Sequence, residues 1–489
     1  MSLITWLILI ILVLNTFGAI FTVLREVRDI STTWAWLLVL IFLPIVGFGF
    51  YLFAGRGLST KKLQRIQHEY ESGVKAFVSL QKHENARNKL LPPTDYTPAA
   101  KALTAFFLNT AQAPVLAHNQ VQLYTDGEKK FAALFRDIEA AKDYIYVEYY
   151  TIYNDELGNQ FQQLLIKKAK EGVVVKVLYD AWGSMGATAK WWRRLTDVGG
   201  QAESYFSSKH PITDFRLNYR DHRKIVVIDD HVGYIGGFNV GDQYVSRKPK
   251  FGYWRDTHLR IIGNTIYALK IRFTMDWNAT VSKKDEIAYS VEQDSADRVT
   301  ADSLTAGATP IQIVASGPDR PTQQIKLGYT QFITSATKSV WIQSPYLVPD
   351  DTVIDALVSA AMSGIDVRIM IPDMPDHPFI FRATQYYANY LTRAGVKIYH
   401  YEHGFMHAKT VVVDNAIASV GSANFDIRSF KLNFEINAFI YDRKVASSLG
   451  QIFEADMARS YLLTPELIAK QSSWLRFKQD FSRLLSPIL

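Results

Sequence analysis

The chain has 489 residues, of which 48% are hydrophobic, a formal net charge of +7 and no cysteine. This length allows two core-forming units besides any membrane anchor, and the lack of cysteine excludes a fold that depends on disulfides. An excess of Lys and Arg suits an anionic lipid surface or, in a free protein, nucleic acid.

Two apolar runs open the chain, Leu3 to Val23 and Trp34 to Phe53. As helices, runs of about 20 residues would span about 30 Å, the thickness of the bilayer hydrocarbon. A signal peptide is the alternative for the first run, but a basic start and a small-residue cleavage site are missing. Two buried core helices conflict with the absence of charge across each run. The pattern therefore predicts two transmembrane helices within residues 1–55.

Basic residues are concentrated after the second apolar run, whereas the loop between the runs carries only Arg25 and Arg28. The basic residues after it include Arg56, Lys61, Lys62, Arg65 and Lys75. Since Lys and Arg are enriched on the cytoplasmic side, the rest of the chain is predicted to lie there. Residues 56–110 are predicted to form a juxtamembrane basic helix and a linker.

Beyond residue 110 the chain repeats itself. The β-rich run Tyr144 to Tyr150 aligns with Val340 to Tyr346, and an amphipathic helix, a glycine and a buried strand follow each run. Strand-helix-strand order is typical of a largely parallel sheet covered by helices. The sequence predicts an α/β fold with two pseudo-symmetric halves, 111–300 and 301–489. Each half is expected to hold a mixed, mostly parallel sheet flanked by helices.

Each half then carries one short motif. It consists of His222, Lys224 and Asp229 in the first half and of His407, Lys409 and Asp414 in the second. Residues two apart project from the same face of a strand, so each His lies beside its Lys. Two matches at these offsets are not chance, and the halves are expected to build one active site together.

Glycine and asparagine follow each motif. The residues are Gly236, Gly237 and Asn239 in the first half and Gly421, Ser422 and Asn424 in the second. Glycine lets the backbone pass close to another group, and we expect that group to be a phosphate oxygen. The two asparagines are candidate phosphate-binding residues, since an amide can donate to a non-bridging oxygen.

This inventory suits a phosphodiester substrate. Cleavage without a metal needs cations and amides on the non-bridging oxygens, a nucleophile, and an acid for the leaving alkoxide. One imidazole would attack phosphorus to form a phosphohistidine, and the other would protonate the departing alcohol. The residues alone leave these two roles interchangeable. Protonated Lys is no zinc ligand and there is no cysteine or HExxH pattern, so neither a metal nor a cofactor is predicted.

Four acidic residues accompany the histidines. Asp256 and Glu435, downstream of the motifs, are candidates for orienting the imidazoles. Asp229 and Asp414 belong to the motifs and count among the candidate catalytic residues. Their position at the end of an apolar strand nevertheless favours tying down a turn over touching substrate.

Other histidines lie near the motifs, and each is expected to be a surface or core residue: His258, His400 and His403. His118-Asn119 and Asp376-His377-Pro378 are further candidates for lining the cleft.

In these motifs the chain resembles the phospholipase D superfamily, whose two HxKxxxxD motifs assemble one site from two halves. Within it, the chain is most similar to the bacterial cardiolipin synthases, on segments that occur in the same order. They include Trp34-Ala-Trp-Leu-Leu, Asn218-Tyr-Arg-Asp-His-Arg-Lys224, Ile235-Gly-Gly-Phe-Asn239, Gly404-Phe-Met-His-Ala-Lys409 and Ser422-Ala-Asn-Phe-Asp-Ile-Arg-Ser429.

The resemblance implies that one phosphatidylglycerol donates its phosphatidyl group to His222 and a second accepts it with His407 as acid and base, giving cardiolipin and glycerol. It also implies a multi-pass protein of the bacterial cell membrane, with phosphatidylglycerol and membrane lipid as partners. No part of the chain resembles a nucleic-acid-binding module, so no nucleic-acid partner is expected.

Two alternatives remain at this point. A phospholipase D or nuclease would use water as acceptor, and a lipid-binding scaffold would carry a vestigial site. The range of acceptors and the oligomeric state stay open.

Overall fold

The computed structural model describes most of the chain after residue 60. The described ranges are 30–43, 61–92, 94–205, 219–288, 308–320 and 322–486, with a few isolated positions before residue 48. The chain divides into two compact units, one of Met1–Lys62 with Phe206–Tyr219 and one of Leu63–Tyr205 with Arg220–Leu489. Both large β-sheets belong to the second unit.

The described part of the first unit contains helix α2, Ile30–Phe42, which overlaps the second apolar run. Within the described ranges, no helix combines the length and the apolar character needed to cross a bilayer. Most of Leu3 to Val23 and of the segment from residue 44 to 60 lies outside those ranges. The two transmembrane helices therefore stay predictions.

A seven-stranded sheet forms the first half, in the order β2-β10-β8-β7-β3-β4-β5. The strands are β2 (Asn119–Tyr124), β3 (Tyr144–Tyr149), β4 (Val174–Asp180), β5 (Gln201–Tyr205), β7 (Lys224–Ile228), β8 (Val232–Gly236) and β10 (His258–Gly263). The helices are α6 (Gly127–Ala140), α7 (Glu156–Lys170), α8 (Ala189–Thr196) and α9 (Thr265–Thr280).

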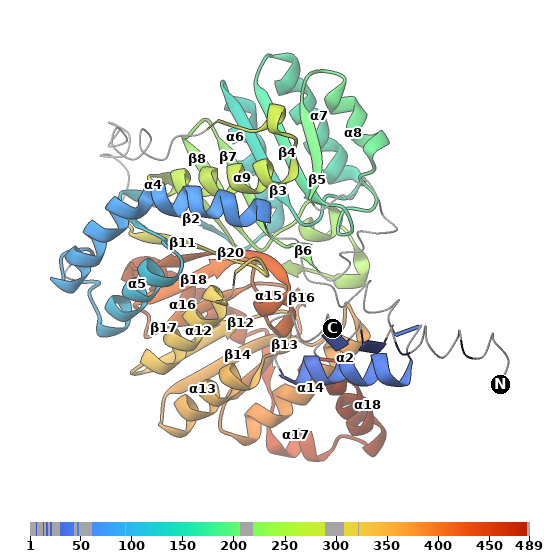
Figure 1. Cartoon of the computed structure of the whole chain (residues 1–489). Coiled ribbons are helices and arrows are strands. Elements are labelled where there is room, and N and C mark those ends of the chain that lie inside the picture. The colour runs from blue at the N-terminus through green and yellow to red at the C-terminus, as the bar shows by residue number, and fades with distance from the viewer. Residues whose placement is uncertain are drawn as a thin grey trace. The chain divides into compact units, whose positions relative to one another are not determined.

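Side chains alternate between the two faces of each strand, and this explains how helices cover both faces of the sheet. Ile145 and Val147 on β3 pack into one core with residues of α6, α7 and α8. Tyr146 points to the other face, where its ring stacks 4.8 Å from Phe273 of α9. Successive side chains of a strand point to opposite faces, so the sheet lies between two helical layers (Figure 1).

The second half repeats this arrangement around the order β1-β11-β20-β18-β17-β12-β14-β15-β21. Its strands are β1 (Val115–Leu116), β11 (Ile311–Ser316), β12 (Ser339–Gln343), β14 (Asp366–Pro372), β15 (Lys397–Tyr401), β17 (Thr410–Val413), β18 (Ile417–Gly421), β20 (Asn433–Ile440) and β21 (Ser460–Leu462). Its helices are α12 (Gln324–Ser335), α13 (Asp351–Met362), α14 (Pro378–Arg393), α15 (Ile427–Lys431), α16 (Arg443–Met457), α17 (Pro465–Ala469) and α18 (Ser473–Leu484).

The prediction of mostly parallel sheets is wrong. Within the two large sheets, parallel pairing is confined to the repeated strand-helix-strand units, β3-β4-β5 and β12-β14-β15, and to the short pair that β20 forms with residues 220–221. The motif strands β7 and β17 instead form hairpins with β8 and β18 and pair antiparallel with β3 and β12.

The hairpin loops explain the difference. Asp229 and Asp230 both have positive φ, 54° and 52°, and so do Asp414 and Asn415, 53° and 48°. Two consecutive left-handed residues form the centre of each tight turn, which the N–H of His231 closes on the carbonyl of Ile228 and that of Ala416 on the carbonyl of Val413. Asp and Asn tolerate this conformation best among residues with a side chain. Each motif aspartate therefore turns its strand back on itself.

Residues 98–110, predicted as part of a linker, form helix α5, Pro98–Thr110. Leu103 and Phe107 of this helix are fully buried in the core of the second half. The ring of Phe107 lies 4.4 Å from that of Phe439. The linker prediction therefore does not describe this segment, while helix α4, Lys61–Ala86, occupies much of the basic stretch before it.

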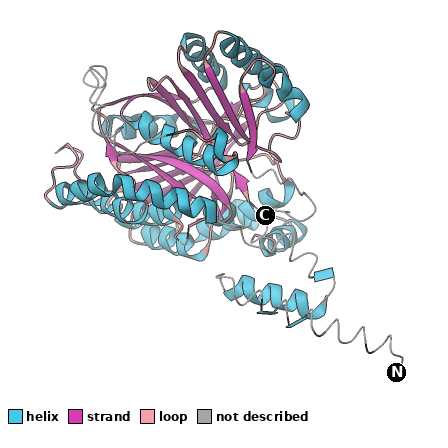
Figure 2. Ribbon diagram, turned by 45° about the horizontal axis from the view of Figure 1, so that its top comes forward, coloured by secondary structure: helices cyan, strands magenta, loops and turns pink. Residues whose placement is uncertain are grey.

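The two halves meet along β8, β10, β18 and β20, where β8 contacts both β18 and β20. Figure 2 shows the strands gathered in the middle of the second unit with helices on the outside. Two short parallel strand pairs also connect the two halves. The first pairs β6 (Arg220–Asp221) with β20, and the second pairs β9 (Trp254–Arg255) with β16 (Phe405–Met406). The segment before each motif histidine therefore lies beside a strand of the opposite half.

Candidate active site

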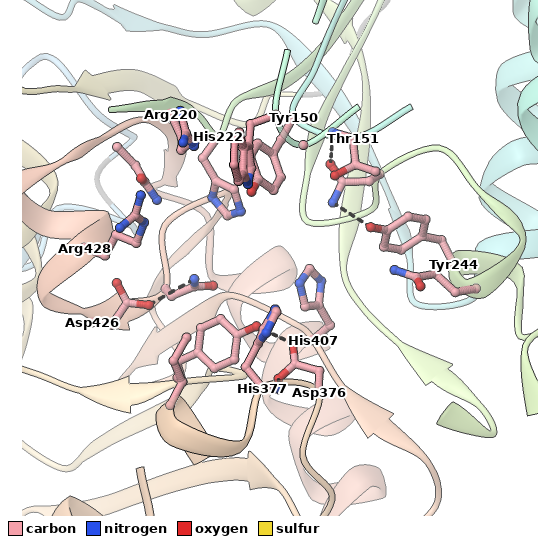
Figure 3. A pocket seen from close by; sticks show the side chains of 18 of the residues that line it. Tyr150, Thr151, Arg220, His222, Tyr244, Asp376, His377, His407, Asp426 and Arg428 are labelled. Atoms are coloured by element: carbon pink, nitrogen blue, oxygen red, sulfur yellow. Dashed lines mark hydrogen bonds between the residues drawn. The ribbon is translucent and has the colours of Figure 1, made fainter. Parts of the chain in front are cut away.

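A cavity of about 400 Å³ lies between the two halves, and both motif histidines line it (Figure 3). Asn239 and Asn424 also line it, as do residues near both motifs that the sequence analysis did not select, including Tyr150, Arg220 and Arg428. The structure thus brings the predicted histidines and asparagines of both halves to one place.

Each histidine is held by a carboxylate of the opposite half. His222 Nδ1 lies 2.9 and 3.0 Å from the two carboxylate oxygens of Glu435, and His407 Nδ1 lies 2.6 Å from Asp256 Oδ2. An ionised carboxylate only accepts hydrogen bonds, so each Nδ1 carries the proton. In the neutral ring, Nε2 then keeps its lone pair for attack or for proton transfer.

The short parallel strand pairs produce this crossed arrangement. The backbone N–H of His222 donates to the carbonyl of Phe434, and that of His407 donates to the carbonyl of Arg255, at 2.9 and 2.7 Å. Phe434 and Arg255 directly precede the two carboxylate residues. Each histidine backbone is therefore fixed to the strand that supplies its carboxylate.

The two carboxylates differ in their other partners. Glu435 accepts hydrogen bonds from Ser422 Oγ and, at 3.2 Å, from Asn433 Nδ2. Burial alone would raise the pKa of Glu435, but His222, Lys224 and Ser422 outweigh it and lower the value. Asp256 accepts, besides His407, the backbone N–H of Thr257 at 2.7 Å.

When no anion is bound, burial favours the neutral form of both imidazoles. Burial lowers the pKa of His222 to about 4, although Glu435 opposes the shift. Burial and the charge of Lys409 lower the pKa of His407 to about 4, against the opposing effect of Asp256. A neutral imidazole is the form that attacks phosphorus, and a bound phosphodiester anion would raise both values again.

The motif lysines lie behind the histidines. Lys224 and Lys409 are buried and do not line the cavity; each Nζ donates to the carbonyl of its own motif histidine at 2.5 Å. Burial lowers the pKa of Lys224 to about 7 and that of Lys409 to about 8, although nearby carboxylates oppose this shift. An anion in the cavity would favour the protonated forms, so charge would build up in these lysines as substrate binds.

The two asparagines reach the cavity wall in different ways. Asn239 Oδ1 accepts the backbone N–H of Thr151 at 3.2 Å, and its Nδ2 lies 3.3 Å from the hydroxyl of Tyr244. Asn424 Nδ2 donates to Asp426 Oδ2 at 3.1 Å, while its Oδ1 is buried and has no hydrogen-bond partner among the described residues.

The glycines after the motifs do not line the cavity. A Cβ atom on Gly237 would overlap the Asp256 carboxylate, and one on Gly421 would overlap the side chain of Asn437. The close approach that the sequence indicates is therefore to the strand that carries each carboxylate, and not to a phosphate oxygen.

Asp229 and Asp414 do not line the cavity either. The Asp229 carboxylate accepts three backbone N–H groups, those of residues Lys142, Asp143 and Tyr144, at 2.6 to 2.9 Å. Asp414 does the same with Thr337, Lys338 and Ser339. Both residues fix a hairpin turn to the start of a neighbouring strand, and their assignment as catalytic residues stays a prediction.

Of the remaining candidates, Asp376 and His377 line the cavity, whereas His258 and His400 are buried elsewhere in the fold. Sequence reasoning missed Arg223, whose guanidinium donates to Asp276 at 2.7 Å inside the first half. The sequence did contain a signal for Arg223, because a charged residue stands between the His and the Lys of an otherwise apolar strand.

This arrangement supports displacement at phosphorus between two imidazoles. Two Nε2 atoms face a common cavity, each imidazole is fixed in one tautomer, and lysines behind the histidines can carry positive charge. Within the described ranges, no group of three or more His, Cys, Asp and Glu is arranged to hold a metal ion.

Comparison with known proteins adds the family context. A family model described as "Cardiolipin synthase, PLD-like domain" matches residues 134–249 and 329–457. A model described as "Phospholipase D-nuclease N-terminal" matches residues 13–56. The first match covers both motif-bearing halves, and the second covers the apolar start of the chain.

Among curated proteins, the chain is 48% identical to a cardiolipin synthase of Listeria innocua over 490 residues, covering 100% of both chains. It is 47% identical to a cardiolipin synthase of Staphylococcus aureus strain Mu50, covering 98% of this chain and 95% of that protein. A crystal structure of phosphatidylserine synthase from Haemophilus influenzae superposes with a TM-score of 0.60 at 17% identity. That match covers 79% of this chain and 100% of the other, and it concerns the fold alone.

Proposed function

The chain belongs to the cardiolipin synthase family of the phospholipase D superfamily, and we propose that it transfers a phosphatidyl group between two phosphatidylglycerol molecules through a phosphohistidine on His222. The observation that carries this proposal is the pair of imidazoles in one cavity, each held through Nδ1 by a carboxylate. Such a pair supplies one nucleophile and one acid on opposite sides of a phosphodiester.

In the first step, Nε2 of neutral His222 attacks the phosphorus of the donor lipid. The P–O bond to the glycerol headgroup breaks, and the imidazolium of His407 gives its proton to the departing glycerol oxygen. Glycerol leaves, and the phosphatidyl group remains on His222. The Glu435 carboxylate then stabilises the positive charge of the phosphorylated ring.

In the second step, neutral His407 takes the proton from the headgroup hydroxyl of the acceptor phosphatidylglycerol. The hydroxyl oxygen attacks phosphorus, and the P–N bond to His222 breaks. Cardiolipin leaves, His222 is neutral again and His407 is protonated for the next cycle. Proton and bond changes therefore balance over the two steps.

The partners of the two carboxylates support this division of roles. Asp256 lies 2.6 Å from His407 and accepts, in addition, only a backbone N–H among the described residues. Glu435 distributes its charge over His222, Ser422 and Asn433. With fewer competing donors, Asp256 keeps more of its hydrogen-bonding capacity for the imidazolium of His407, which is the form that a general acid needs.

Cardiolipin synthases are membrane enzymes, and we place this chain in the bacterial cell membrane. The two apolar runs would anchor it, with the catalytic part on the cytoplasmic side, where the Lys and Arg excess after the second run supports this orientation. Phosphatidylglycerol would then reach the cavity from the same bilayer.

The test is to incubate the purified protein with labelled phosphatidylglycerol alone and to follow the products. Cardiolipin and glycerol in equal amounts are expected from the native chain, and neither from His222→Ala. Phosphatidic acid without cardiolipin would instead support the second candidate, a phospholipase D that uses water. A trapped phosphatidyl adduct on His407 and not on His222 would reverse the two roles.

A further inference from the structure

Two arginines line the cavity on the His222 side, one from each half. Arg220 belongs to β6 and Arg428 to α15. Figure 3 shows both side chains next to His222, on the side away from Tyr244. The Arg220 guanidinium lies 5.4 Å from the ring centre of Trp182, another residue of the cavity wall.

The electrostatics of these arginines suit an anion. Burial and the charge of Arg220 both lower the pKa of Arg428, which means that the two cations repel each other. Asp426 and Asp180 offset part of this repulsion. A bound phosphate would attract both cations, and a planar guanidinium can donate two parallel hydrogen bonds to its oxygens.

The proposed reaction requires a place for a second phosphate. While the first phosphate reacts between the two histidines, the acceptor phosphatidylglycerol brings a phosphate of its own, joined to the attacking hydroxyl through the short glycerol chain. Two phosphate anions close together repel each other. The motif lysines lie behind the histidines, so a second anion needs other cations.

We propose that Arg220 and Arg428 bind the phosphate of the acceptor phosphatidylglycerol. This inference rests on the proposed function. It explains how a lipid acceptor is preferred over water or a small alcohol, since neither of these presents an anion to the two guanidinium groups.

The test compares lipid and neutral acceptors in Arg220→Gln and Arg428→Gln. Cardiolipin formation is expected to fall about 10-fold or more, since a hydrogen bond to a charged group contributes about 1.5–3 kcal/mol. Formation of phosphatidylethanol, with ethanol as acceptor, is expected to stay within about 2-fold. Lys190→Gln, an exposed change on α8, serves as the matched control for lost charge.

Other outcomes separate the possibilities. Equal losses with both acceptors would mean that the arginines act on the donor and would overturn the proposal, as would unchanged cardiolipin formation. Retained ethanol transfer shows that the variants are folded. Failure of the native chain to make any cardiolipin would instead refute the proposed function itself.

A separate observation concerns helix α18, Ser473–Leu484. It exposes a row of large apolar side chains at helical spacing: Trp474 (65% exposed), Phe477 (56%), Phe481 (48%) and Leu484 (71%). The three rings stack in succession, with centres 5.4 and 6.4 Å apart. The opposite face is buried, where Gln479 accepts from Asn389 of α14 at 3.1 Å. Soluble surfaces rarely leave such a continuous apolar row open to water.

Position and charge identify the partner. Two residues after α18, Ser486 lines the cavity, together with His377, which precedes α14, and Ile380 of α14. The apolar row therefore ends two residues before a residue of the cavity wall. Basic residues accompany it on or just before the helix: Lys470, Arg476, Lys478 and Arg483. An apolar face with basic neighbours fits the headgroup layer of an anionic bilayer.

We infer that α18 lies in the surface of an anionic membrane and brings the cavity mouth to the lipid headgroups. Because the chain has no cysteine, a single introduced cysteine can carry a spin label. Phe481→Cys reports on the apolar face, and Lys129→Cys, at an exposed position of α6 in the first half, is the control.

In phosphatidylglycerol vesicles, the label at position 481 should be accessible to oxygen and protected from a water-soluble nickel complex, and the label at 129 should show the reverse. Nickel access at 481 would overturn the inference. So would protection from both reagents, because that result means that a protein segment covers the face.

Enzyme activity provides a second test of membrane docking by α18. Phe477→Ser combined with Phe481→Ser should lower activity on vesicles about 10-fold, with little change on dispersed short-chain phosphatidylglycerol. Equal activity on vesicles would contradict a role in docking.

Discussion

The crossed carboxylates allow the roles of the two histidines to be separated by exchanging each carboxylate for its amide. Asp256→Asn keeps the shape of the side chain next to His407 but removes its charge, and Glu435→Gln does the same next to His222. If His407 is the acid and His222 the nucleophile, the two changes should affect different parts of the reaction.

The size of the expected effect follows from the hydrogen bond between Asp256 and His407. A hydrogen bond to a charged group contributes about 1.5–3 kcal/mol and a neutral one about 0.5–1.5 kcal/mol, so the loss of charge at Asp256 removes about 1–2 kcal/mol. At about 1.36 kcal/mol for each tenfold change, glycerol release from phosphatidylglycerol should slow by about 5- to 30-fold. This is a lower limit, because the imidazolium of His407 also loses its counter-charge in a buried site.

The assay uses two donors. Phosphatidylglycerol needs a proton on its leaving group, whereas a phosphatidyl ester of p-nitrophenol releases a stable anion without one. In a rapid-mixing experiment, Asp256→Asn should slow the glycerol burst but leave the p-nitrophenolate burst within about 3-fold. Glu435→Gln should slow both bursts, since attack by His222 is common to them.

The opposite pattern, with the p-nitrophenolate burst sensitive to Asp256→Asn and insensitive to Glu435→Gln, would assign the nucleophile to His407. If neither amide changed either burst, the His–carboxylate contacts would not matter for catalysis and the reasoning would be refuted.

Further predictions concern stability and packing. Asp229→Ala should lower the free energy of unfolding by about 2–3 kcal/mol, because charge-assisted hydrogen bonds to a turn are lost. The kcat of the folded fraction should stay within about 3-fold. If Asp229 were catalytic, the change would instead abolish kcat and leave Tm unchanged. Gly237→Ala should reduce activity at least 10-fold because the added methyl displaces the Asp256 carboxylate, and normal activity would show that this carboxylate can shift without harm. Arg255→Met should cost about 3–5 kcal/mol in chemical denaturation, since it leaves Asp456 buried without its guanidinium partner; a loss below about 1 kcal/mol would mean that the pair is not needed. The unfolded state binds protons at His222 and His407 near pH 6.5, whereas the folded state binds them near pH 4, so stability should fall as the pH falls from about 6.5 to about 4, by up to about 3 kcal/mol for each histidine. Thermal unfolding across this range measures the slope, and His407→Asn should make it shallower.

The residue types of the site could be read from the sequence, but their pairing could not. The motif spacing identifies His222 and His407, and their chemistry calls for a carboxylate partner at Asp256 and Glu435. Sequence distance gives no reason to pair each histidine with the carboxylate of the other half. That pairing depends on two-residue strands such as β6 and β16, which are too short to leave a periodic signal.

The fold, like the site, could be predicted from the sequence only in part. Repeated strand-helix-strand segments correctly indicate an α/β architecture, with parallel pairing for the strands that they contain. The motif strands pair antiparallel because Asp229-Asp230 and Asp414-Asn415 adopt left-handed turns, a signal that lies in two residues and not in a long pattern. The cavity arginines were missed because Arg220 and Arg428 come together only in space.

The crossed pairs also bear on how such a chain can have arisen. Neither half contains a complete His–carboxylate pair, so a single half is chemically incomplete. An ancestor with one half must have worked as two identical copies, each lending its carboxylate to the other across a twofold axis. Joining the copies removed the requirement that both sides be the same. One side now uses Glu435 with Ser422 and the other uses Asp256 against Gly237. Two sides that differ can hold histidines with different roles, as the proposed mechanism requires.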